Sequence, residues 1–472
     1  MKNQSQTHAR PHAALAVLSA ANFVAALDLF IVNVAFNAIG HDYHSASQSD
    51  LSWVLNGYAI VFGALLIPAG RLADRYGRRA AFLLGLGVFT AGSAGCAVAP
   101  SLWTLVGFRL LQAAGAAILT PSSLGLVLAA FPGKEGPRAV RIWAASGAIA
   151  AAAGPVVGGA LVQANWRLVF LVNVPIGVVA LILGVRLLRE SRDPSATRLP
   201  DLPGALLLAA AIGALSLGLV KGPDWGWGAT STLTAYLVAI VGVAAVGYRS
   251  SRHAAPVIEP ALLRVRTFAW SNVAAIAFSA SFAANMLLLV LWLQRVWGWS
   301  AIDTGLGVAP GPMMVPAFAV VAHRLQRRIG SGGVTALGCL MFAASVVLML
   351  TSLGTSSSYS SEILPGLILG GSGIGLALPE IMSASTSTLP ADRTSTGSAI
   401  INMSRQVGSV LGISVMIALL GTPRTASQAL DQFRTTFWVI AAAGLIGAVL
   451  ALGMTPRTPA PLIAVDAASE TP

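Results

Sequence analysis

Apolar segments of about 20 residues, separated by short polar stretches, run along almost the whole chain. A helix of that length crosses the hydrocarbon core of a bilayer, so the pattern predicts an all-α membrane protein with about 14 transmembrane helices. The predicted helices cover residues 13–36, 51–69, 80–99, 102–128, 141–162, 168–188, 202–220, 232–248, 267–293, 304–322, 334–353, 363–379, 396–420 and 433–453.

Charged side chains are rare in this chain. They make up 10% of its residues, and 56% of its side chains are hydrophobic. Soluble globular domains carry roughly 25% charged residues. This composition agrees with the helical pattern, and the lipid bilayer is the expected environment.

The basic residues are divided unevenly between the two sides of the predicted membrane. Of the 29 Lys and Arg residues, 22 lie in the tails and the loops on the tails' side, five in the opposite loops and two inside helices. The positive-inside rule then predicts a multi-pass protein of the cell membrane with both termini in the cytoplasm. Topology thus explains the net charge of +12. Nucleic acid is not an expected partner, because no basic stretch is interleaved with stacking aromatics.

Other sequence features argue against a leader peptide and against catalysis. The first apolar run is longer than a signal-peptide core and carries Asp28, so we interpret it as a helix. Cys96 and Cys339 lie in separate apolar segments and predict neither a disulfide nor a metal site. The sequence has no P-loop, dinucleotide fingerprint or zinc-protease motif. No cofactor and no enzymatic activity are expected.

Weak internal repeats predict two related halves. Three pairs of short segments match at offsets of 253 to 258 residues. The predicted domains are six-helix bundles over residues 1–190 and 263–456, two inserted helices over 191–262 and a cytoplasmic tail over 457–472. The matching segments end at Gly77 and Gly330, at Gly158 and Gly412, and at Pro121 and Pro379.

Several motifs resemble those of the major facilitator superfamily, and closely those of its 14-helix drug:proton antiporter family. "GRLADRYGRR" is similar to the loop motif between helices two and three, and "RLLQAAGAA" to the fourth-helix motif. "GAIAAAAGPVVGG" resembles the antiporter motif of the fifth helix, and "NWRLVFLVNVPIG" the entry into the sixth. "LDLFIVNVAFN" resembles the first-helix motif, with Phe30 in place of Thr and Phe36-Asn37 in place of Leu-Pro. The resemblance implies the major facilitator fold and exchange of small molecules against protons; a monomer is expected.

The loop motif concentrates charge between two apolar segments. One interpretation is that its arginines only fix the topology. Topology alone needs neither an acid nor glycines, which allow tight turns and close backbone approach. We therefore predict a conformational lock between the ends of the two halves, in which Asp74 accepts bonds from arginines or helix amides. The lock comprises Gly70, Arg71, Asp74, Arg75, Gly77, Arg78 and Arg79.

The fifth-helix motif combines Gly147, Gly154, Gly158 and Gly159 with Pro155. Small residues at this spacing let helices approach closely, and an internal proline favours a kink. Packing alone would explain the pattern. The family resemblance favours a further role, in which the seam limits leak and biases the outward gate.

Asp28, Arg109 and Arg405 lie well inside predicted helices. An unpaired charge there costs at least about 2.5 to 3.5 kcal/mol, so these residues must face a cavity or one another. Asp28 is the leading candidate for the proton carrier, and the resemblance makes Arg109 its modulator. A permanent structural ion pair is the alternative.

Further polar residues are weaker candidates. Glu380 and Asp303 are predicted near helix ends, where solvation is expected. Asn33, Gln112, Arg405 and Gln406 are candidates for the cavity. The expected function is proton-coupled export of small amphipathic drugs or antibiotics, cationic ones included. Export of a specific endogenous metabolite, and a transporter-like receptor without flux, are the alternatives.

Overall fold

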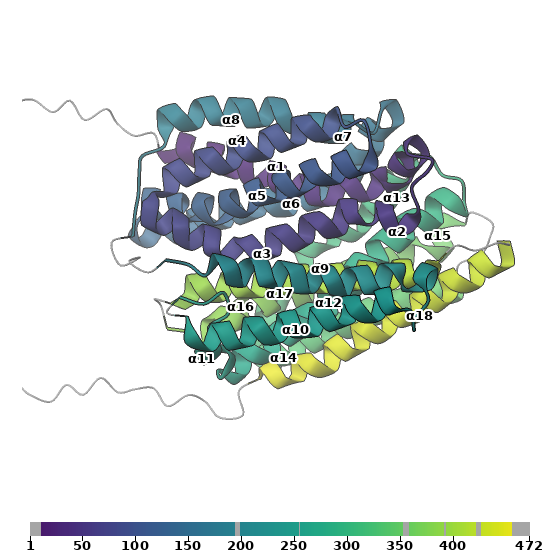
Figure 1. Ribbon diagram of the computed structural model, residues 1–472. Coiled ribbons are helices and arrows are strands. Elements are labelled where there is room, and N and C mark those ends of the chain that lie inside the picture. Colours follow the sequence, from purple (N-terminus) through teal and green to yellow (C-terminus); the bar gives the residue numbers. More distant parts are fainter. Residues whose placement is uncertain are drawn as a thin grey trace, which may run out of the picture.

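The computed structural model describes residues 11–193, 199–253, 255–352, 358–390, 393–421 and 426–455. Most residues in these ranges are helical, and no strand occurs among them. Thirteen helical segments of the described chain are long and apolar enough to cross a membrane. The helices lie side by side in one bundle (Figure 1).

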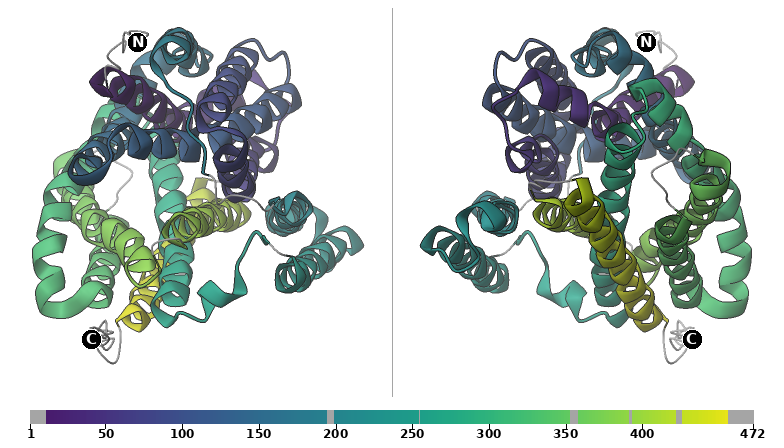
Figure 2. Two further views of the ribbon diagram at one scale, coloured as in Figure 1. Left: turned by 90° about the vertical axis from the view of Figure 1, so that its left-hand side faces the viewer. Right: turned by 90° about the vertical axis from the view of Figure 1, so that its right-hand side faces the viewer.

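One of the 13 segments makes two crossings. Helix α14 (Pro310–Ser352) has 43 residues, which would extend about 65 Å at the helical rise, twice the hydrocarbon thickness of about 30 Å. Its backbone leaves the helical conformation at Gly330, with φ at 72° and ψ at 165°. The chain turns back there, as the light-green helices of Figure 2 show. The described chain therefore makes 14 crossings, which confirms the predicted fold class.

The helices that precede residue 190 pack around one another. Helix α1 lies along α6, and α5 lies between α3 and α4. Their bounds are α1 (Pro11–Asp42), α2 (Gln48–Leu51), α3 (Trp53–Tyr76), α4 (Arg78–Ala97), α5 (Leu102–Ala130), α6 (Gly136–Ala164), α7 (Leu168–Leu171) and α8 (Asn173–Leu187). Polar caps begin two of them: Ser47 and Asp50 form a capping box at α2, and Ser101 caps α5.

The helices after residue 260 form a second group. Helix α14 packs on α16 and α18, and α12 packs on α17 and α18. The predicted helix 304–322 is divided, because α13 ends at Val308 and α14 begins at Pro310. The bounds are α11 (Pro260–Leu263), α12 (Arg266–Arg295), α13 (Ala301–Val308), α15 (Tyr359–Glu362), α16 (Leu364–Ser387), α17 (Thr394–Leu420) and α18 (Ala426–Ala451).

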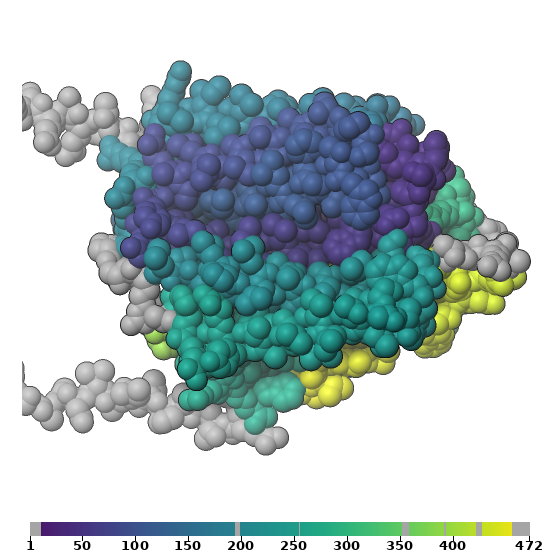
Figure 3. Space-filling view, in the orientation of Figure 1, coloured from purple at the N-terminus to yellow at the C-terminus, as the bar shows by residue number. Residues whose placement is uncertain are grey.

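The inserted helices α9 (Leu202–Trp225) and α10 (Thr230–Arg252) pack on each other at the edge of the bundle (Figure 2). Their teal surface covers part of the face in Figure 3. Helix α9 contacts both α3 and α17, and Asn56 Nδ2 donates to Ser216 Oγ at 3.3 Å and to Ser414 Oγ at 3.1 Å. The domain boundaries remain a prediction, and the tail 457–472 lies outside the described residues.

Helix α1 begins and α18 ends on the same side of the bundle (Figure 1). We call this the termini side and the opposite one the far side. Helix α6 ends and α13 begins on the far side, whereas the loop between α3 and α4 lies on the termini side.

Candidate functional site

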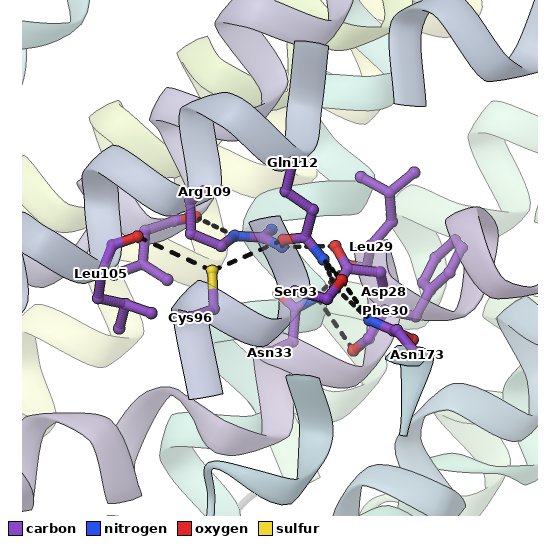
Figure 4. A network of polar contacts seen from close by, with 11 residues as sticks. Asp28, Leu29, Phe30, Asn33, Ser93, Cys96, Leu105, Arg109, Gln112 and Asn173 are labelled. Atoms are coloured by element: carbon purple, nitrogen blue, oxygen red, sulfur yellow. Dashed lines mark hydrogen bonds and ion pairs between the residues drawn. The ribbon is translucent and has the colours of Figure 1, made fainter. Parts of the chain in front are cut away.

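Asp28 and Arg109 meet inside the first group of helices (Figure 4). Arg109 Nη1 donates to Asp28 Oδ2 at 2.5 Å, and the two side chains are 1% and 0% exposed. The carboxylate comes from α1 and the guanidinium from α5. The sequence did not determine that they meet; the packing of α1 against α5 brings them together.

Amides from two helices complete the hydrogen bonding of Asp28. Gln112 Nε2 donates to Asp28 Oδ1 at 2.8 Å, and Asn173 Nδ2 donates to the same oxygen at 3.1 Å. Gln112 also accepts from Arg109 Nη1 at 2.6 Å and donates to Ser93 Oγ at 2.7 Å. A charged carboxylate can remain in so low a dielectric because a cation and two amides solvate it.

The Arg109 guanidinium has further partners on α3 and α7. Its Nε donates to Val54 O at 3.1 Å, and its Cζ lies 4.2 Å from the Tyr58 ring centroid and 5.6 Å from that of Phe170. Aromatic faces stabilise a desolvated cation. The positive charge is therefore held on one side by Asp28 and on another by aromatic rings.

Asp28, Arg109 and Gln112 were predicted from the sequence, whereas Ser93, Asn173 and Tyr58 were not. Each of these three is a polar residue in an otherwise apolar segment, and Asn173 lies within "NWRLVFLVNVPIG". That signal was present. Many buried polar residues, however, form hydrogen bonds only within their own helix. A polar residue in an apolar segment therefore did not by itself identify these three as members of the network.

The other cavity candidates lie outside this network. Asn33 Nδ2 donates to the backbone of its own helix, to Leu29 O at 3.1 Å and Phe30 O at 3.3 Å. Arg405 and Gln406 lie on α17. A Cβ atom on Gly63 would be 3.0 Å from Gln406 Cβ, so α3 and α17 approach closely there.

The two weaker acid candidates have different environments. Asp303 is exposed in the first turn of α13, and Ser300 Oγ donates to it at 2.5 Å. The expectation that Glu380 is solvated near a helix end is wrong. Helix α16 continues to Ser387, and Glu380 is buried at 4% exposure.

The predicted lock motif forms a compact turn between α3 and α4. Arg78 Nε donates to Asp74 Oδ1 at 2.7 Å, and the peptide N–H of Asp193 donates to Asp74 O at 2.9 Å. Gly77 has φ at 131°, and a Cβ there would lie 2.7 Å from the Glu190 carboxyl carbon. Only glycine fits this backbone and leaves room for Glu190, which accepts from the first amides of α4.

A different residue of the motif reaches the second group of helices. Arg71 Nη2 donates to Glu259 Oε1 at 2.7 Å, and Arg393, at the start of α17, donates to Glu259 Oε2. Arg71 Nη1 also donates to Pro256 O at 3.0 Å. Glu259 therefore joins α3 to α17 on the termini side, a contact that Asp74 was predicted to make.

Two remaining arginines of the motif stay near the loop. Arg75 lies over the ring of the neighbouring Tyr76, and Arg79 Nη2 donates to Val185 O at 2.7 Å. Gly70 lies close to α5, since a Cβ there would be 3.3 Å from Pro121 Cβ.

The glycines of α6 face two different helices. A Cβ on Gly147 would be 3.1 Å from Asn22 Nδ2 of α1, and one on Gly154 or Gly158 would lie within 3 Å of an α1 side chain. One on Gly159 would lie 2.4 Å from Ala301 O, in α13. Gly147, Gly154 and Gly158 therefore face α1, whereas Gly159 serves the contact with the second group of helices.

A close far-side contact joins the two groups. A Cβ on Gly305 of α13 would be 2.2 Å from the carbonyl oxygen of Pro155, inside α6. Gln294 Nε2 donates to Val34 O at 3.2 Å, and Arg295 Nε donates to Asn37 Oδ1 at 3.2 Å. Backbones in contact leave no room for solute between α6 and α13 at this level.

Two packed groups of apolar crossings, joined by this glycine contact, with a buried ion pair inside the first group, are the architecture of a multi-pass membrane transporter. The chain belongs to the Major Facilitator Superfamily, because the model of that family matches residues 18–413. The resemblance noted in the sequence is thereby confirmed.

Similar proteins are antibiotic export and resistance proteins. The tetracenomycin C resistance and export protein of Streptomyces glaucescens is 34% identical over 418 residues, covering 88% of this chain and 76% of that protein. The methylenomycin A resistance protein of Streptomyces coelicolor is 33% identical over 399 residues, covering 84% and 83%. The multidrug resistance protein Stp of Mycobacterium tuberculosis is 34% identical over 400 residues, covering 84% and 74%.

Solved transporter structures share the fold. The crystal structure of the peptide transporter POT in complex with sulfate superposes with a TM-score of 0.67 and covers 94% of each chain. At 18% sequence identity, this similarity describes the architecture and says nothing about the substrate.

Proposed function

We propose that this protein exports small amphipathic drugs or antibiotics by alternating access and takes up protons in exchange. Export is supported by relatives that are named for antibiotic export and resistance. Proton coupling is supported by one observation above all, the carboxylate of Asp28 buried against Arg109.

The chemistry of the pair suits proton exchange. Burial in a low dielectric favours the protonated form of a carboxyl group, whereas an adjacent guanidinium favours the carboxylate. A shift of α1 relative to α5 that separates the two groups would therefore favour proton uptake, and their return would favour release. A membrane potential of 100 mV contributes about 2.3 kcal/mol for each charge moved.

Flux in proteoliposomes tests this function. Vesicles with an imposed pH gradient are loaded with cationic, neutral and anionic amphipaths in turn, and an internal pH dye reports proton movement. We expect at least one compound to move against its gradient, with protons moving the other way. If every compound bound without being transported, the receptor interpretation would be favoured. If the substrate flux did not change with the pH gradient, proton coupling would be contradicted.

Export also requires a defined orientation, and we predict that the termini side is cytoplasmic. Ser251→Cys and Gly228→Cys place exposed thiols at opposite ends of α10, while the native Cys96 and Cys339 are buried. A membrane-impermeant thiol reagent added to intact cells should label Gly228→Cys and spare Ser251→Cys. The reverse pattern would invert the topology.

We propose further that the Arg71–Glu259–Arg393 bridge is the contact of the predicted lock, and that Asp74 shapes the loop through Arg78. Glu259→Gln leaves both arginines without their carboxylate. Because partly exposed ion pairs each contribute up to about 1 kcal/mol, export should slow roughly threefold to tenfold at unchanged membrane abundance.

Two further variants make the lock test specific. Asp74→Asn should also slow export by weakening the Arg78 contact. Glu135→Gln removes an exposed acid near the start of α6 and should export at the wild-type rate. Wild-type rates in both Glu259→Gln and Asp74→Asn would reduce the motif to a topology signal.

A further inference from the structure

Arg405 is a cation within a transmembrane helix, and no acidic side chain in the described part of the chain pairs with it. It lies near the middle of α17, and its Nη1 donates to Asn402 Oδ1 at 3.2 Å. Its Nε is buried without a hydrogen-bond partner. None of the ion pairs formed by the described residues includes it. A charge in this position is costly unless something compensates it.

A polar stripe continues from Arg405 along one face of α17. The spacing of its members, by three or four residues, places them on one side of a helix. Arg405 O accepts from Ser409 Oγ at 3.0 Å, and Asn402 Nδ2 donates to Ser398 O at 2.9 Å. The stripe consists of Ser398, Asn402, Arg405 and Ser409, and all four side chains are half-buried.

The other faces of α17 are occupied by neighbouring helices. Gly408 and Gly412 lie against α12, where added Cβ atoms would be 2.3 Å from Ile276 O and 2.1 Å from Ala280 O. Gln406 lies against α3 at Gly63. Ile400 and neighbouring apolar residues pack in one cluster with α9, the peripheral inserted helix. The polar stripe therefore turns away from α9, between a helix of each group.

The remaining charges in the middle of described transmembrane helices do not compensate Arg405. Asp28 is bound by Arg109. Glu380 faces Ser331 and His323 of α14. The uncompensated charge at the boundary between the two groups is thus positive, and a cationic substrate would be repelled there.

We propose that Arg405 binds the acidic group of an amphipathic organic anion, a carboxylate, sulfonate or similar oxyanion, with Asn402 positioning the guanidinium. The inference rests on the proposed transport function and names its substrate class. The planar guanidinium presents several donors to such a group, and the unpartnered Nε supplies one of them.

Equilibrium binding with chemically matched probes tests the proposal. 8-Anilinonaphthalene-1-sulfonate and N-phenyl-1-naphthylamine share one aromatic body, but only the first is an anion. Binding to the purified protein in nanodiscs is measured by fluorescence, with protein-free nanodiscs subtracted. Because a hydrogen bond to a charged group is strong, Arg405→Gln should weaken sulfonate binding about tenfold or more. Binding of the neutral probe should stay unchanged, which also shows that the variant is folded.

Further variants and a cationic probe distinguish recognition of the anion by Arg405 from an effect of the substitution on the fold. Arg405→Lys should keep part of the preference for the sulfonate. Arg186→Gln removes an exposed arginine at the end of α8 and should bind both probes like wild type. Tetraphenylphosphonium should bind Arg405→Gln more tightly than wild type, because the repelling charge is gone.

Equal sulfonate binding by wild type and Arg405→Gln would overturn the proposal. Tighter binding of tetraphenylphosphonium than of the sulfonate by the wild-type protein would overturn it as well. The assay contains no pH gradient, so its outcome is independent of proton coupling. Intact sulfonate selectivity without flux would contradict the transport function alone.

Discussion

Asp28→Asn should abolish export driven by a proton gradient while leaving a folded protein in the membrane. Asparagine keeps the shape of the side chain and an oxygen that can accept from Arg109, but it does not titrate. Flux of substrate and of protons in pH-gradient vesicles should fall to the level of protein-free vesicles, and ligand binding should persist.

The network can accommodate the substitution. The new amide nitrogen needs an acceptor, and Asn173 Oδ1 is buried without a partner. Rotation of the Asn173 amide would turn this oxygen toward residue 28. A loss of flux in Asp28→Asn would therefore report on the proton and not on unfolding.

Asp42→Asn is the matched control, since it makes the same exchange in the same helix. Asp42 pairs with Arg167 at 2.6 Å, and its side chain is 43% exposed. This variant should export normally. Proton movement coupled to substrate at the wild-type ratio in Asp28→Asn vesicles would assign the proton to another group. Glu380 would come first, because it is the other buried acid described in a transmembrane helix.

Arg109→Gln should destabilise the protein more than Asp28→Asn does. It leaves the Asp28 carboxylate buried without its cation, and removal of one partner from a buried ion pair costs about 3 to 5 kcal/mol. Arg109 also carries the contact with Val54 O and the stacking on Tyr58. The midpoint of thermal unfolding in detergent should fall by several degrees, and export should cease.

The double variant Asp28→Asn/Arg109→Gln distinguishes charge from packing. With both charges removed, much of the lost stability should return, whereas export should not. An unfolding midpoint no higher than that of Arg109→Gln alone would show that lost packing around the guanidinium, and not the unpaired carboxylate, causes the destabilisation.

The sequence alone determined the features that depend on spacing along one helix. Apolar runs of membrane-spanning length specified the crossings. Lipid offers no hydrogen-bond partners to backbone N–H and C=O groups, so a single crossing segment must satisfy them within its own helix. Internal charges identified Asp28, Arg109 and Arg405, because unpaired charge is rare in such segments. Glycines identified the close contacts of α6 but not their partners.

Only the tertiary structure decided which side chains meet. Asn173 lies 145 positions from Asp28, and Glu259 lies 188 positions from Arg71. Helical periodicity specifies the face on which a residue lies, yet the neighbour of that face depends on how the helices pack. For this reason Asp28 has a cationic partner, Arg405 belongs to none of the ion pairs among the described residues, and Glu380 is buried. A sequence pattern determines which charges enter the membrane, and the packing of distant helices determines which of them are neutralised there.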